Sequence, residues 1–161
     1  MNSFKELFAL DKALKLIYSV FGIGYVPIGS GTVCSIVPCL IIGLLGDQIS
    51  ILVRILIALL ILVVAFISTN IKFDDADPGY VVIDEFLGMW ISLILVPSGP
   101  SGLVWVLIAF ILFRFFDITK LLGISRIEKL NGATGIVMDD VVAGLISALI
   151  LVTSFYFLQF S

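Results

Sequence analysis

The chain has 161 residues, of which 61% are hydrophobic and 13% are charged, and its formal net charge is −3. Since soluble domains carry about 25% charged residues, this composition excludes an ordinary soluble domain and predicts a single membrane-embedded domain over residues 1–161. The small acidic charge and the lack of a basic stripe argue against nucleic acid as a partner, and the absence of histidine excludes histidine-dependent catalysis and histidine-ligated zinc.

The first 20 residues combine charged side chains with apolar ones at roughly helical spacing, namely Phe4, Leu7, Phe8, Leu14, Ile17 and Tyr18. This pattern predicts an amphipathic helix that lies along the membrane surface or over the domain. The glycine-rich stretch GIGYVPIGSGT follows and ends at Thr32. A loop of this kind before a helix can direct backbone N–H groups at an anion; a flexible connection is the alternative.

Five apolar stretches come next, at residues 32–46, 50–69, 80–97, 102–118 and 136–160. A membrane-spanning helix needs about 20 apolar residues, within a range of about 17–25. We therefore expect an all-α, polytopic membrane bundle with four or five transmembrane segments. The first stretch is short and contains Pro38, so a kinked or re-entrant segment is an open alternative there.

The basic residues indicate how such a bundle is oriented. If all five stretches span, one side receives Lys5, Lys12, Lys15, Lys72, Lys120, Arg126 and Lys129, whereas the loops of the other side have no lysine or arginine. By the positive-inside rule the basic side is cytoplasmic. The N-terminus is then inside and the C-terminus outside.

Five carboxylates lie at the cytoplasmic ends of the last three stretches: Asp84, Glu85, Asp117, Asp139 and Asp140. An ionised side chain at membrane depth costs about 2.5–3.5 kcal/mol, so such groups face a protein interior, a water-filled cavity or a metal. Independent helix caps are the alternative, because acids in a first turn favour the helix dipole.

Arg114 and Lys120 offset only two of these five charges. A bound divalent cation would relieve the remaining repulsion, and oxygen ligands without histidine or cysteine favour Mg²⁺ or Mn²⁺. Arg114, Asp117 and Lys120 are spaced i, i+3 and i+6, so they share one helical face. They form either a structural ion pair with a snorkelling lysine or a grip for a phosphate.

Small residues recur four apart on two of the acid-bearing stretches, as Gly88 with Ser92 and Gly144 with Ala148. Such pairs let helix backbones approach closely. Because each pair shares a face with an acid, this spacing predicts that the third and fifth stretches meet near their carboxylates.

The stretches PIGSGTVCS, VVIDEFLGMWISLILVP, FRFFDITK and NGATGIVMDDVVAG resemble the phosphatidylglycerophosphatase A family, in the family's order. The resemblance implies a Mg²⁺-dependent membrane phosphatase of phospholipid biosynthesis, which removes the phosphate monoester of phosphatidylglycerophosphate to give phosphatidylglycerol. It also implies a bacterial cytoplasmic membrane, with the active site on the cytoplasmic face.

Taken together, residues and resemblance predict a set of roles. One or two Mg²⁺ ions are held by Asp84, Glu85, Asp139 and Asp140, which with Asp117 form the catalytic set; the substrate phosphate is bound by Gly31, Thr32, Arg114 and Lys120. Asp117 orients Arg114 or acts as an acid or base. The functional alternative is an ion or proton transporter, although the far halves of these helices, such as WVLIAF and ISALILV, offer almost no polar groups for a path.

Overall fold

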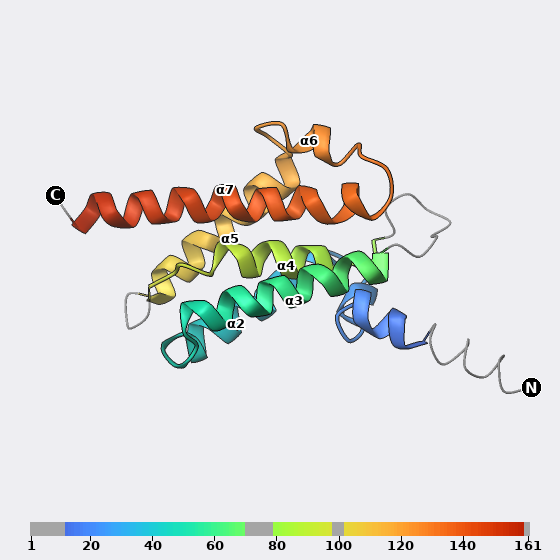
Figure 1. The fold of residues 1–161 in the computed structure, drawn as a ribbon, viewed down its shortest axis with the longest axis horizontal. Helices are drawn as coiled ribbons and strands as arrows, with labels where there is room; N and C mark the ends of the chain where they lie inside the picture. The colour runs from blue at the N-terminus through green and yellow to red at the C-terminus, as the bar shows by residue number, and fades with distance from the viewer. Residues whose placement is uncertain (1–11, 70–78, 98–101, 160–161) are drawn as a thin grey trace, which may run out of the picture.

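The computed structural model describes residues 12–69, 79–97 and 102–159, and over these ranges it is all-helical, as predicted (Figure 1). Residues 12–18 form a helix. The elements that follow are η1 (Ile23–Tyr25), α2 (Ser30–Leu45), η2 (Gly46–Gln48), α3 (Ile51–Thr69), α4 (Ile83–Ser92), α5 (Gly102–Thr119), α6 (Ile124–Ile127) and α7 (Ala133–Gln159).

Four helical segments are long and apolar enough to cross a membrane: Ser30–Gln48, Ile51–Thr69, Gly102–Thr119 and Ala133–Leu158. Their outward faces expose large apolar side chains, such as Leu60, Leu107 and Leu149. Apolar surface this extensive is rare on a protein in water and is what a hydrocarbon environment accepts. The chain is a polytopic membrane protein.

The first predicted stretch is a continuous helix. α2 runs through Pro38 without a break, although proline lacks the N–H that would bond one turn back. Residues 30–45 therefore form one helix, and the choice between a spanning segment and a kinked or re-entrant one at residues 32–46 stays a prediction.

The third predicted stretch, residues 80–97, is only partly helical. α4 has 10 residues, which at about 1.5 Å per residue cover only half of a hydrocarbon core of about 30 Å. After Ser92 the chain tightens into bonds of the 3₁₀ type, such as the one from the Val96 N–H to the Leu93 carbonyl at 3.2 Å. Pro97 then has no N–H to bond one turn back, so a helical ladder cannot resume there.

Arg54, on the first turn of α3, satisfies the carbonyls that this break leaves open. Its Nη1 donates to the Leu93, Ile94 and Val96 carbonyls at 3.3, 3.2 and 3.0 Å, and its Nη2 donates to the Gly46 carbonyl at 2.7 Å. The side chain is only 2% exposed. Non-helical backbone at membrane depth is tolerated when protein groups pair it, and this arginine does so.

α4 is the centre of the bundle and packs against α2, α3, α5 and α7. In Figure 1 it runs between α7 and α3, and the N-terminal helix, the end of α3 and the start of α7 lie together at the right of the view. The N-terminal helix is tied to this end, because the Val82 N–H donates to the Tyr18 carbonyl at 2.9 Å. The helix observed at residues 12–18 confirms that part of the predicted N-terminal helix, and residues 1–11 of the prediction lie outside the described residues.

Candidate active site

The five predicted carboxylates line one cavity of about 530 Å³. The first turn of α4 supplies Asp84 and Glu85, the last turn of α5 supplies Asp117, and α7 supplies Asp139 and Asp140. All except Glu85 are buried, and Glu85 is half-buried. The predicted convergence of three segments is therefore present in the fold, together with Arg114 and Lys120 in the same cavity wall.

Three of the acids form a tight cluster, which we call the acid triad: Asp84, Glu85 and Asp140. One oxygen from each lies within 4.8 Å of the others. Ligands of one octahedral ion with bonds of about 2.0–2.1 Å are separated by about 3–4 Å, so small side-chain movements bring this triad to ligation distance. Within the described ranges, Glu85 Oε2 is one of two buried side-chain atoms without a hydrogen-bond partner.

Asp139 was predicted with this triad, but its oxygens are engaged elsewhere. Its Oδ2 accepts from Lys120 Nζ at 2.7 Å, and its Oδ1 accepts from the Asp140 N–H at 2.9 Å. Adjacent residues on a helix point about 100° apart, so only one of the two aspartates can face α4. That residue is Asp140.

Gly31 leaves space for the carboxylate of Glu85 in the acid triad. A Cβ at this position would collide with the carboxylate of Glu85, so the side chain of Glu85 lies directly on the backbone of α2. Thr32, predicted beside it, is half-buried and is not part of the cavity wall. Ser30 lines the cavity instead, and its hydroxyl donates to the Gly79 carbonyl at 2.9 Å.

Arg114, Asp117 and Lys120 form a connected network at the end of α5. Arg114 Nη1 donates to Asp117 Oδ2 at 2.5 Å, while Lys120 Nζ donates to Asp117 Oδ1 at 2.8 Å. Both oxygens of Asp117 are thus occupied by cations. Arg114 Nε, by contrast, is buried and unpaired.

Electrostatics at the site favour a cation beside the acid triad. Asp84 is buried beside the carboxylates of Glu85 and Asp140. Burial opposes the charge of Lys120, but Asp140 and Asp117 outweigh it and raise the pKa of its ammonium above the ordinary value. Three carboxylates this close either take up protons or bind a cation of higher charge.

The predicted close approach of α4 and α7 occurs at two glycines. A Cβ on Gly144 would collide with the carbonyl oxygen of Gly88, and a Cβ on Gly88 would lie 2.6 Å from the carbonyl oxygen of Asp140. Asp84 lies four residues before Gly88, and Asp140 lies four residues before Gly144. Residues four apart share a helix face, so the glycine contact is one turn away from both aspartates. The glycine contact therefore sets the distance between two members of the acid triad.

Of the polar residues in the cavity wall, sequence reasoning missed Glu128 and included Ser30 only as part of the glycine-rich stretch, without a role of its own. Ser30 opens α2 directly after Gly29, which has a positive φ of 68°. A glycine followed by serine before an apolar stretch is a signal for the start of a helix, and it places Ser30 at the first position of that helix. Glu128 lies in the loop between α6 and α7, and its sequence neighbourhood carries no comparable signal.

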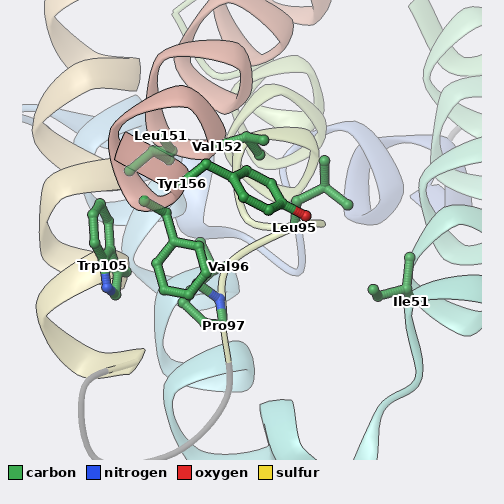
Figure 2. Close-up of a pocket in the computed structure, with 9 residues that line it drawn as sticks. Ile51, Leu95, Val96, Pro97, Trp105, Leu151, Val152 and Tyr156 are labelled. Carbon is green, nitrogen blue, oxygen red and sulfur yellow. The ribbon is translucent and has the colours of Figure 1, made fainter. Parts of the chain in front are cut away.

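A second cavity, of about 160 Å³, lies at the opposite end of the bundle (Figure 2). Its walls are apolar and aromatic, and include Trp105 and Pro97 together with Tyr156 from the last turns of α7. None of the described residues that line it is charged. This cavity therefore offers neither cations nor carboxylates to a ligand, in contrast to the acid-lined cavity.

Comparison with known proteins places most of the chain in one family. Residues 16–155 match the family model described as Phosphatidylglycerophosphatase A. The chain is 43% identical over 76 residues to phosphatidylglycerophosphatase A of Escherichia coli and 44% identical over 75 residues to that of Haemophilus influenzae, covering 47% and 46% of this chain. It is 45% identical over 75 residues, 47% of this chain, to a Bacteroides thetaiotaomicron protein provisionally named a phosphatidylinositol-3-phosphatase.

These alignments span about half the length of each relative: 43% for Escherichia coli, 45% for Haemophilus influenzae and 47% for Bacteroides thetaiotaomicron. No solved structure matches the chain significantly. The family model, however, extends from the N-terminal helix to the last turns of α7 and includes every residue of the acid-lined cavity. The chain belongs to the phosphatidylglycerophosphatase A family.

Proposed function

We propose that this protein is a membrane phosphatase that hydrolyses the phosphate monoester of phosphatidylglycerophosphate to phosphatidylglycerol with the help of Mg²⁺. The observation that carries the proposal is the acid-lined cavity, in which three helices bring together five carboxylates, an arginine and a lysine. Family membership supports the choice of reaction.

Asp84, Glu85 and Asp140 would hold the metal. Their donor atoms are all carboxylate oxygens, which suit Mg²⁺, and the buried Oε2 of Glu85 has no protein partner. When bound, a divalent cation supplies Lewis-acid polarisation of a phosphoryl oxygen or lowers the pKa of a water. The triad fits such an ion because the low dielectric around it penalises three anions without a counter-charge.

Arg114 would bind the phosphate. Its Nη1 donates to Asp117 Oδ2 at 2.5 Å, and its buried Nε has no protein partner among the described residues. A planar fork of this kind matches two phosphate oxygens at once and stabilises the charge that develops on them. The predicted contacts of Gly31, Thr32 and Lys120 with the phosphate stay predictions.

The cavity suits a lipid whose phosphate is polar and whose tails are not. Ile118 lines the cavity, yet it is 68% exposed on the outer face of α5. A headgroup phosphate at Arg114 would therefore have a direct apolar exit for its acyl chains into the hydrocarbon.

We place the site on the cytoplasmic face of a bacterial cytoplasmic membrane. Lys12, Lys15, Lys120, Arg126 and Lys129 belong to segments at the acid end of the bundle, while the loops at the other end contain no lysine or arginine. This asymmetry supports a cytoplasmic acid end by the positive-inside rule. A C-terminal reporter that proves cytoplasmic would contradict this orientation.

Transport is less well supported. Between the acid end and Arg54, the buried side chains of the described residues are mostly apolar, and the buried hydroxyls of Ser35 and Ser147 donate to carbonyls of their own helices. The buried hydroxyl of Ser92 donates to the Met89 carbonyl of its own helix rather than to a path. A translocation route for ions needs polar groups through the bilayer.

The test is phosphate release from lipid vesicles that contain phosphatidylglycerophosphate or phosphatidylinositol 3-phosphate, with soluble glycerol 3-phosphate for comparison. We expect release from phosphatidylglycerophosphate, abolished by EDTA and lowered at least about 100-fold by Asp84→Asn. The matched control is Asp47→Asn, an exposed aspartate at the opposite end of the bundle. An unaffected Asp84→Asn rate would refute the site, and a preference for phosphatidylinositol 3-phosphate would refute the substrate alone.

A further inference from the structure

Lys120 is enclosed by carboxylates. Its Nζ lies 2.8 Å from Asp117 Oδ1, 2.7 Å from Asp139 Oδ2 and 3.4 Å from Asp140 Oδ1. An ammonium has three N–H donors, and these three contacts use all of them. The side chain is therefore arranged as the centre of a carboxylate site rather than as a free donor for a ligand.

The backbone of Lys120 is held in an unfavourable conformation to make these contacts. Its φ of 49° is in the left-handed region, where glycine is favoured. The turn is closed by the Lys120 N–H to the Phe116 carbonyl at 2.9 Å and by the Ser125 N–H to the Lys120 carbonyl at 3.1 Å. Local strain of this kind persists where surrounding contacts hold it in place, and it concentrates at functional sites.

Asp140 joins this arrangement to the acid triad. Its carboxylate belongs to the cluster with Asp84 and Glu85, and one of its oxygens also faces Lys120. Asp139 and Asp117 have both of their oxygens occupied by Lys120, Arg114 or a backbone N–H. The described site thus consists of two adjacent three-carboxylate positions that share Asp140, one of them filled by an ammonium.

We infer that the site binds one divalent cation, at the acid triad, and that the ammonium of Lys120 takes the place of a second cation. This inference rests on the proposed function, because it presumes that the triad binds metal. Two-metal phosphoryl-transfer sites place their ions about 3.5–4 Å apart. Here a covalently attached positive charge holds Asp139 and Asp140 in position, and it cannot be lost to a chelator.

The experiment counts the Mn²⁺ ions bound per chain by electron paramagnetic resonance on the full-length protein in detergent. Lys120→Gly removes the ammonium at a position whose φ glycine accepts. Leu122→Gly is the matched control, since Leu122 lies in the same turn, has a φ of 56°, is 72% exposed and does not line the cavity. We expect one ion in the wild type, one in Leu122→Gly and two in Lys120→Gly.

Two ions in the wild type, or a folded Lys120→Gly protein that binds only one, would overturn the inference. No ion in the wild type would overturn the proposed metal site itself, which separates the two failures. A second pair of variants does not depend on the folding of Lys120→Gly. Asp139→Asn should still bind one ion, because Asp139 pairs with Lys120 and is not a ligand of the metal. Asp84→Asn should bind none. Loss of the ion in Asp139→Asn would contradict the assignment of Asp139 to the lysine.

Discussion

Replacing Gly144 by alanine tests how the glycine contact between α4 and α7 positions the acid triad. The added Cβ would lie 3.1 Å from the carbonyl carbon of Gly88 and closer still to its oxygen. Neither atom can rotate away, because both belong to the backbone of α4. The two helices must therefore move apart, and Asp84 moves away from Asp140.

The size of the effect follows from the overlap. Restoring ordinary van der Waals contact requires a displacement of about 1 Å, and a misplacement of that size costs about 100-fold in rate. The same overpacking lowers the free energy of unfolding by about 1–3 kcal/mol. We therefore expect Gly144→Ala to fold, to bind Mn²⁺ more weakly and to release phosphate about 100-fold more slowly.

Metal affinity, phosphate release and thermal unfolding are measured together, on the same preparation. Gly43→Ala is the matched control, because it makes the same change on a spanning helix where the new Cβ meets only the flexible end of Leu103, at 3.2 Å. Wild-type metal affinity and rate in Gly144→Ala would refute the reasoning that this contact sets the geometry of the triad.

Three further perturbations test other parts of the site and fold. Gly31→Ala should displace the Glu85 carboxylate and weaken Mn²⁺ binding at least about 10-fold, as measured by titration; unchanged affinity would show that Glu85 is not a ligand. Arg114→Lys keeps the charge but loses the planar fork, so kcat/KM for the lipid phosphate should fall about 10–100-fold, and a smaller fall would argue against a direct phosphate contact. Arg54→Met leaves several buried carbonyls unpaired and should lower the free energy of unfolding by at least about 3 kcal/mol, whereas the exposed Arg126→Met should change it little; equal stability of the two variants would refute the structural role of Arg54.

The long helices and the common end for the acids were predictable from sequence. Apolar stretches of about 20 residues have few alternatives to a spanning helix, and segment ends alternate between two sides. The short α4 was not predictable in this way, because residues 80–97 are apolar throughout and their length fits a full span. Its break depends on Arg54, about 40 residues earlier in the chain, whose guanidinium replaces the missing helical bonds.

The pairing of individual acids also lay beyond the sequence. Asp139 and Asp140 are neighbours about 100° apart on α7, and α7 is apolar on most of its circumference, so its pattern does not fix which aspartate faces α4. The glycine contact at Gly88 and Gly144 fixes it. The partners of Lys120 on α7 are 19 and 20 residues away, and a left-handed turn that no residue-type rule predicts for lysine brings them into reach.

The central claim is that helices α4 and α7 share one hard cation. Its most direct test is to locate bound Mn²⁺ by anomalous scattering in a crystal of the full chain. The account predicts a peak within about 2–2.5 Å of oxygens from Asp84, Glu85 and Asp140. A peak ligated by Asp139 and Asp117 with Lys120 displaced, or no peak at the acid triad in a Mn²⁺-saturated crystal, would contradict it.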